Sequence, residues 1–249
     1  MQIIDLRNNN IIVTGAGSGI GRETCLLLDK LGANVIYLDI DKNGLEETRS
    51  RMVGQNHEQY VVDLTDEIAL KEFTDDVILK KSLIHGLVHC AGISSRKPLN
   101  VLKKEGFSKI MDVNFYSFVE LVKHLTKKKC FCEGGSIVVM SSISSIKGYK
   151  AKTEYCVSKA AVDSFVRCMA LELASKRIRI NSIMPGEVLT PMGIKAREMA
   201  LLSGTDEIVN QPLGPTEPYE VANLIAFLLS QATKTITGTS VRIDGGASI

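Results

Sequence analysis

The chain has 249 residues, of which 45% are hydrophobic and 23% charged, and its formal net charge is +2 at pH 7. This composition is typical of a globular protein with a sizeable core, and the small net charge gives no indication of a nucleic-acid partner. No apolar run reaches the roughly 18 residues of a membrane span, and the first residues lack the apolar region of a signal peptide. We therefore expect a cytoplasmic protein that binds neither nucleic acid nor membrane.

The first predicted element is a β-branched apolar strand, Ile11-Ile12-Val13-Thr14, which runs directly into a glycine-rich loop from Gly15 to Gly21. A helical pattern follows and stops at Gly32, and a second strand, 35–38, ends in Asp39. In this order the glycines let the backbone approach a pyrophosphate, and the helix N-terminus supplies free N–H groups. Asp39 is placed to accept a hydrogen bond from a ribose 2′-hydroxyl. The order predicts a dinucleotide-binding site.

Strands and helices continue to alternate along the chain. Further strands are predicted at 59–62, 86–89, 136–140, 178–183 and 240–243, and further helices at about 43–53, 65–79, 105–129, 155–175 and 217–230. Short apolar strands separated by amphipathic helices are typical of a parallel sheet that is covered on both faces. The sequence therefore predicts a single α/β domain over residues 1–249, a doubly wound (Rossmann) seven-stranded parallel sheet with helices on both faces.

The stretch 190–215 interrupts this alternation, because prolines and glycines surround a short apolar piece, 192–202. It follows the C-terminal end of a strand, where ligands bind in open α/β sheets. A loop of this length in a compact domain is usually functional or mobile. We expect a substrate lid here, with a surface excursion as the alternative.

Tyr155 and Lys159 lie four residues apart at the start of the predicted helix 155–175, so their side chains share one helix face. A tyrosine pKa of about 10 leaves almost no phenolate near neutral pH, and a nearby ammonium lowers that pKa. Ser142, at the end of the strand 136–140, is placed to hold a substrate oxygen beside the phenol. Beside a nicotinamide, these residues predict proton transfer coupled to hydride transfer. For the Tyr155–Lys159 pair alone, a chance arrangement on one helix face is the alternative.

The six cysteines show no pattern that indicates a disulfide or a metal. No C-x-x-C pair is present, so free thiols are expected. Cys130-x-Cys132 with His124 upstream matches no common zinc spacing. We therefore predict no metal site.

Several motifs along the chain together resemble the short-chain dehydrogenase/reductase family, in its single-domain branch. They are Thr14-Gly15-x-x-x-Gly19-Ile20-Gly21, Ala91-Gly92, Asn114, Ser142, Tyr155-x-x-x-Lys159 and Pro185-Gly186. The resemblance extends from Ile11 to Gly246 and is nearest to the family's 3-oxoacyl-[acyl-carrier-protein] reductases. It implies an oxidoreductase that interconverts a secondary alcohol and a ketone by hydride transfer.

The resemblance also implies catalytic roles for individual residues. Tyr155 is the expected general acid/base, and Ser142 is expected to orient and polarise the carbonyl. Lys159 is expected to lower the pKa of Tyr155 and to bind the nicotinamide ribose. Asn114 is expected to hold a water that links Lys159 to solvent.

The resemblance implies a cofactor site and an assembly as well. Besides Tyr155 and Lys159, the implied cofactor-binding residues are Gly15, Ser18, Gly19, Ile20, Asp39, Ile40, Asp63, Leu64, Cys90, Ala91, Gly92, Pro185, Gly186, Val188 and Thr190. Among them, Asp63-Leu64 are expected at the adenine, and Val188 with Thr190 at the carboxamide. The family's tetramers pack through two long helices, here about 105–129 and 155–175, so a homotetramer is implied, with a dimer as the alternative.

Asp39 also bears on the choice between NAD and NADP. A carboxylate there accepts the ribose 2′-hydroxyl and repels a 2′-phosphate, which carries up to two negative charges. NADP-using members of the family usually carry Arg or Lys at the positions of Ser18 and Ile40, and Asp41 adds negative charge here. Arg22, inside the helix, argues weakly the other way. We predict NAD(H) as the cofactor, with NADP less favoured.

Two residues depart from the family pattern. Cys90 replaces the usual Asn of an Asn-Ala-Gly turn, which removes an amide that normally ties neighbouring loops; it either weakens local order or packs as a small hydrophobe. Glu187 puts a carboxylate near the nicotinamide, where an apolar or aromatic residue is common. It either binds a polar substrate group or faces solvent.

Other functions share part of this pattern. A sugar or polyol dehydrogenase, or a hydroxysteroid dehydrogenase, of the same family would have the same motifs, so the sequence leaves the substrate open. A non-catalytic NAD-binding sensor or scaffold is expected to lack Tyr155 or Lys159, and both are present. A sugar-nucleotide epimerase needs a differently spaced glycine motif and a larger C-terminal domain.

Overall fold

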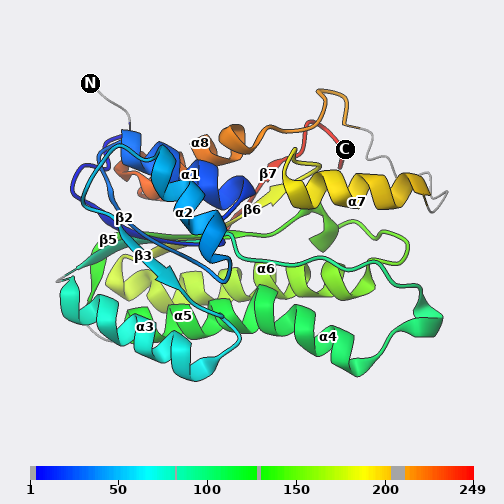
Figure 1. Ribbon diagram of the computed structural model, residues 1–249, viewed down its shortest axis with the longest axis horizontal. Helices are drawn as coiled ribbons and strands as arrows, with labels where there is room; N and C mark the ends of the chain where they lie inside the picture. The colour runs from blue at the N-terminus through cyan, green and yellow to red at the C-terminus, as the bar shows by residue number, and fades with distance from the viewer. Residues whose placement is uncertain (1–3, 82, 128–129, 203–210) are drawn as a thin grey trace.

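The computed structural model describes residues 4–81, 83–127, 130–202 and 211–249 (Figure 1). Its centre is a seven-stranded sheet with all pairs parallel, in the order β3-β2-β1-β4-β5-β6-β7. The strands are β1 (Asn10–Thr14), β2 (Asn34–Asp39), β3 (Glu58–Val61), β4 (Ile84–His89), β5 (Phe131–Met140), β6 (Arg179–Pro185) and β7 (Ser240–Ile243). The predicted doubly wound fold with seven parallel strands is confirmed.

Helices cover both faces of the sheet (Figure 1). On one side lie α1 (Gly19–Lys30), α2 (Lys42–Arg51) and α8 (Pro218–Leu229), and on the other α3 (Glu67–Lys80), α4 (Lys104–Met111), α5 (Ser117–Lys127) and α6 (Thr153–Leu173). In the part of the chain that the structure describes, no helix combines the length and the apolarity needed to cross a membrane.

The residues of β1 show why the strand is apolar throughout. Successive side chains of a strand point to opposite faces of the sheet. Ile12 packs in the core with Phe118 of α5, whereas Ile11 packs in the opposite core with Leu28 of α1 and Ile225 of α8. Because both faces are covered, every position of the strand from Ile11 onward is buried.

Two segments differ from the predicted helices. The predicted helix 105–129 is divided, because a π-helical turn, Asp112–Tyr116, separates α4 from α5. The stretch 190–215, predicted as a loop, contains a twelve-residue helix, α7 (Pro191–Leu202). Pro191 is its first residue, where a proline is compatible with a helix start. Residues 203–210 of the predicted lid lie outside the described residues.

Candidate active site

A cavity of about 1110 Å³ lies along the C-terminal ends of the strands. The strand order reverses between β1 and β4, and ligands bind at such a switch point in open α/β sheets. Every residue predicted for catalysis or cofactor binding lines this cavity, except Asn114. The topology thus brings to one cavity residues that are far apart in the sequence.

The glycine loop has the open backbone that a pyrophosphate needs. Gly15 has a φ of +67°, and a Cβ there would lie 2.6 Å from the backbone nitrogen of Ala91. Only glycine therefore fits where β1 passes the turn after β4. Helix α1 begins at Gly19 with no side-chain cap from Ser18 and no acidic residue in its first turn. Its first N–H groups and partial positive charge thus remain available, and the loop fits the pyrophosphate of a dinucleotide.

Asp39 ends β2 beside the glycine loop. Its carboxylate accepts hydrogen bonds from the N–H groups of Gly17 (2.9 Å) and Asp41 (3.0 Å). These bonds fix the side chain on the cavity wall and leave its oxygens further lone pairs, which fits a ribose hydroxyl. The neighbouring wall residues Ser18 and Ile40 are exposed and carry no positive charge.

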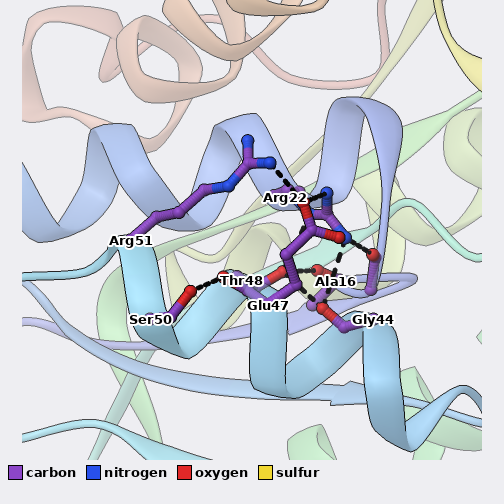
Figure 2. Close-up of polar contacts among 8 residues, drawn as sticks. Ala16, Arg22, Gly44, Glu47, Thr48, Ser50 and Arg51 are labelled. Atoms are coloured by element: carbon purple, nitrogen blue, oxygen red, sulfur yellow. Dashed lines mark hydrogen bonds and ion pairs between the residues drawn. The ribbon is translucent and has the colours of Figure 1, made fainter.

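Arg22 of α1 is directed toward α2 (Figure 2). Its guanidinium donates to the Gly17 carbonyl and to Thr48 Oγ1 (3.1 Å), and it forms an ion pair with Glu47 (2.7 Å). Thr48 in turn donates to the Ala16 carbonyl (2.8 Å). These contacts join the glycine loop to α2. The carboxylate of Glu47 neutralises the charge of Arg22.

Tyr155, in the first turn of α6, meets Ser142, which follows β5. Burial raises the pKa of Tyr155 to about 12, and the hydrogen bond with Ser142 acts in the opposite direction. Ser142 itself is 8% exposed, and its hydroxyl also accepts from the Ser144 N–H (3.1 Å). The structure therefore brings the phenol and the Ser142 hydroxyl into contact, and the phenol is protonated at neutral pH.

Lys159 lies one turn further along α6. Its Nζ is 5.7 Å from the centroid of the Tyr155 ring and donates to the Met140 carbonyl (2.7 Å). Burial lowers the pKa of Lys159 to about 8, whereas the nearby carboxylate of Asp163 acts in the opposite direction. The sequence predicts that Lys159 lowers the pKa of Tyr155. In the structure the ammonium binds a backbone carbonyl, and Ser142 is the group that lowers that pKa.

Asn114 lies in the π-helical turn and is fully buried, so it does not line the cavity. Its amide accepts from the Ile93 N–H (2.8 Å) and donates to the Ile93 carbonyl (3.0 Å) and to Ser158 Oγ (3.0 Å). A Cβ on Gly92 would lie 3.3 Å from Asn114 Oδ1 and 3.5 Å from Lys159 Nζ. Asn114 and Lys159 thus approach each other across Gly92, and Oδ1 keeps one acceptor lone pair.

The turn after β4 is held by Thr14, the first residue of the glycine motif, and by His89, for which the sequence predicts no function. Thr14 Oγ1 accepts from the Ala91 N–H (3.1 Å) and lies 3.0 Å from His89 Nδ1. The Thr14 hydroxyl and His89 Nδ1 share one proton in this hydrogen bond, and either group can donate it. Cys90 packs against the core as a small hydrophobe. The sequence does contain a signal for Thr14 and His89: each is a polar residue at the end of a buried apolar strand.

Glu187 lines the cavity near α7. Its side chain is 13% exposed, and its carboxylate pairs with Arg197 of α7 at 3.5 Å. Its backbone N–H donates to Gln211 Oε1 (2.6 Å), and this bond fixes the backbone at Glu187. Glu187 therefore does not simply face solvent. The described part of the predicted lid, α7, is a wall of the cavity.

The chain is similar over nearly its whole length to known reductases and dehydrogenases. A family model described as enoyl-(acyl carrier protein) reductase matches residues 15–248. The 3-oxoacyl-[acyl-carrier-protein] reductase FabG of Thermotoga maritima is 36% identical over 241 residues, which cover 96% of this chain and 97% of that protein. Human (3R)-3-hydroxyacyl-CoA dehydrogenase is 33% identical over 253 residues, with 97% and 96% covered. The crystal structure of levodione reductase has a TM-score of 0.90 at 26% identity, covering 98% of each chain.

Proposed function

Because the chain belongs to the short-chain dehydrogenase/reductase family, whose members are oxidoreductases acting on alcohol and ketone groups, we propose that it is an NAD(H)-dependent enzyme that interconverts a secondary alcohol and a ketone. The similarity to FabG makes a 3-oxoacyl thioester the first substrate to test. The observation that carries the proposal is the contact between Tyr155 and Ser142 in a cavity that also contains the glycine loop.

The residues of the chain have distinct tasks in this proposal. The nicotinamide, when bound, supplies the hydride chemistry. Ser142 donates a hydrogen bond to the substrate oxygen and orients it. Tyr155 gives its phenol proton to the oxygen of a ketone that is reduced, or takes a proton from an alcohol that is oxidised. The raised pKa of Tyr155 keeps that proton on the phenol near pH 7, so the phenol can donate it to a ketone oxygen.

Lys159 and Asn114 supply the proton path behind Tyr155 in this proposal. Lys159 places an ammonium beneath the phenol ring, and its pKa of about 8 lets it exchange a proton near neutral pH. Asn114 Oδ1, which keeps one acceptor lone pair, and Lys159 Nζ both approach Gly92, and in this proposal a water lies between them. The water would return to Tyr155, through Lys159, the proton given to the substrate.

Three features support NAD(H) over NADP(H). Asp39 presents a carboxylate beside the glycine loop, where it accepts a hydroxyl and repels a phosphate. Ser18 and Ile40 provide no positive charge on the same wall. Arg22 is already paired with Glu47 and also donates to the Gly17 carbonyl and to Thr48, so a carboxylate of the protein neutralises its charge.

The proposal extends to a homotetramer, with a dimer as the alternative. The support is a set of exposed apolar side chains along the helices that would form the interface. Tyr116 of the π turn is 53% exposed, and Val157 and Leu171 of α6 are 46% and 82% exposed. Light scattering coupled to size-exclusion chromatography measures the mass, and a monomer at micromolar concentration would contradict the proposal.

The test of function is the oxidation of NADH and of NADPH in the presence of a panel of ketones. The panel contains 3-oxoacyl thioesters, keto-sugars, ketosteroids and diketones. Turnover with NADH supports both the reaction and the cofactor, and the preferred ketone names the substrate class. Turnover only with NADPH would refute the argument from Asp39 and leave the reaction standing. Tight NADH binding without turnover of any ketone would favour the non-catalytic sensor instead.

A further inference from the structure

A buried carboxylate, Glu154, directly precedes Tyr155 and is not part of the cavity wall. It is 1% exposed, accepts a hydrogen bond from Ser95 Oγ, and pairs with Lys97 at 3.4 Å. Both partners belong to the segment 93–98 that follows β4. This segment forms one side of the active cavity through Ile93, Ser94 and Arg96.

The segment 93–98 has space on both sides. A second cavity of about 360 Å³ lies behind it, between Lys97, Gly106 of α4 and Glu154, and it shares Ile93 and Ser94 with the first. The contacts with Glu154 connect this wall of the active cavity directly to the helix turn that carries Tyr155.

The same two parts of the chain are also joined through the backbone. The Lys97 N–H donates to the Ala151 carbonyl at 2.7 Å. Ala151 has a φ of +62°, a left-handed conformation that L-residues other than Asn and Asp rarely adopt. A strained residue persists where the surrounding contacts require it. Here the strained residue is Ala151, whose carbonyl accepts the hydrogen bond from the Lys97 N–H.

Gly106 of α4 leaves the room that the Lys97–Glu154 pair occupies. A Cβ at this position would collide with Glu154 Oε1 and lie 2.7 Å from Lys97 Nζ. Glycine is a poor helix former compared with alanine, yet it occupies the first turn of α4. The Lys97–Glu154 pair thus explains why a glycine occupies position 106. Three segments, 93–98, α4 and the first turn of α6, converge on one buried carboxylate.

We propose that Glu154 is a positioning residue that sets the substrate side of the active site. With Ser95 and Lys97, it fixes the segment 93–98 against the first turn of α6 and so sets the distance between that wall and the Tyr155 phenol. A carboxylate suits the place, because the N-terminus of α6 carries partial positive charge and both partners donate to its oxygens. The kinetic consequence rests on the proposed function, whereas the ordering of the segment does not.

The variant Glu154→Gln keeps the shape of the side chain and an acceptor for Ser95, but it removes the charge that pairs with Lys97. The KM for the ketone is expected to rise about tenfold while kcat stays within about twofold, because the substrate wall is displaced and the reacting groups are intact. Hydrogen exchange of the amides in 93–98, followed by mass spectrometry, is expected to become about tenfold faster. The dissociation constant for NADH, from nucleotide fluorescence, should not change.

The matched control is Glu172→Gln, a carboxylate on the exposed side of the same helix. It is expected to change neither KM nor exchange in 93–98. A Glu154→Gln enzyme with wild-type KM and wild-type exchange would overturn the proposal. Lower thermal stability with an unchanged KM would also overturn it, because Glu154 would then be a structural residue only.

A second variant, Gly106→Ala, tests the pair from α4. Alanine favours the helix, but its Cβ pushes Glu154 and Lys97 apart, so KM and exchange are expected to rise as in Glu154→Gln. Wild-type values in Gly106→Ala would contradict the proposal even if Glu154→Gln failed to fold. If the wild-type enzyme turns over no ketone, the proposed function fails, and hydrogen exchange alone decides whether Glu154 orders the segment.

Discussion

The cofactor side and the substrate side of the cavity are held in place by different kinds of contact. On the cofactor side, Asp39 and Arg22 bind the backbone of Gly17 from two directions. On the substrate side, α7 is joined to the strand end by the pair of Glu187 with Arg197, whose side chain is 46% exposed. The bonds to the Gly17 backbone are part-buried and involve charged side chains, and such hydrogen bonds contribute more than a half-exposed ion pair. Changes on the cofactor side should therefore affect binding and stability strongly, and changes at α7 should affect substrate affinity weakly.

Tyr155 lies between the two sides, and removal of its hydroxyl is expected to have the largest effect on kcat. Tyr155→Phe keeps the ring and its packing but removes the proton, so kcat should fall about 10³-fold. The dissociation constant for NADH should change less than about threefold. Steady-state NADH oxidation and fluorescence titration measure the two quantities. A parallel loss of NADH binding would assign Tyr155 to the cofactor side instead.

Asp39→Ala removes the residue on which the cofactor prediction depends. The affinity for NADH should fall about 10- to 100-fold, because a hydrogen bond to a charged group contributes about 1.5–3 kcal/mol. The affinity for NADPH should be retained or rise, since the repulsion of the 2′-phosphate is gone. Glu46→Ala, at an exposed carboxylate of α2 that does not line the cavity, is the matched control. Equal losses for both nucleotides would show that Asp39 acts only by holding the Gly17 N–H.

The same comparison explains which parts of the site the sequence could predict. Asp39, Ser142 and the glycine loop directly follow strands, and the C-terminal ends of parallel strands meet at one edge of the sheet, so their places followed from the alternation of elements. The contact of Lys97 with Glu154 joins residues 57 positions apart with no local pattern. Helix α7 was predicted as a loop because proline and glycine in its first turn resemble a turn signal.

The π-helical turn was not predictable from periodicity, since it changes the register inside one apolar helical pattern. It bears directly on the site, because Asn114 lies within it. The Thr14–His89 contact was missed for another reason: both residues end strands that were assigned from their apolar neighbours alone. Local patterns thus placed the strand ends, and the contacts between distant segments needed the structure.

His89, on the cofactor side, should make stability depend on pH. Burial and the charge of Lys159 lower the pKa of His89 to about 3, from an ordinary value of 6.5. The unfolded chain therefore binds one more proton below pH 6.5, so stability is lost as the pH falls from about 6.5 to 3, by about 1.4 kcal/mol per pH unit. His89→Asn cannot titrate, and its unfolding free energy in urea should depend less on pH. Parallel curves for the two proteins would contradict the assignment.

Arg197→Met tests the substrate side and has the smallest expected effect. A half-exposed ion pair contributes at most about 1 kcal/mol, so KM should rise less than about fivefold, with NADH affinity unchanged. Salt at about 1 M should produce the same change in the wild type, because it screens exposed charges.

Glu187→Gln separates the two roles that remain for this carboxylate. If Glu187 only holds α7, its variant and Arg197→Met should raise KM equally, since each breaks the same pair. If Glu187 also binds a polar group of the substrate, Glu187→Gln should have the larger effect, and the effect should vary with the ketone used. An Arg197→Met enzyme impaired as severely as Asp39→Ala would break the comparison itself, because α7 would then be held as firmly as the glycine loop.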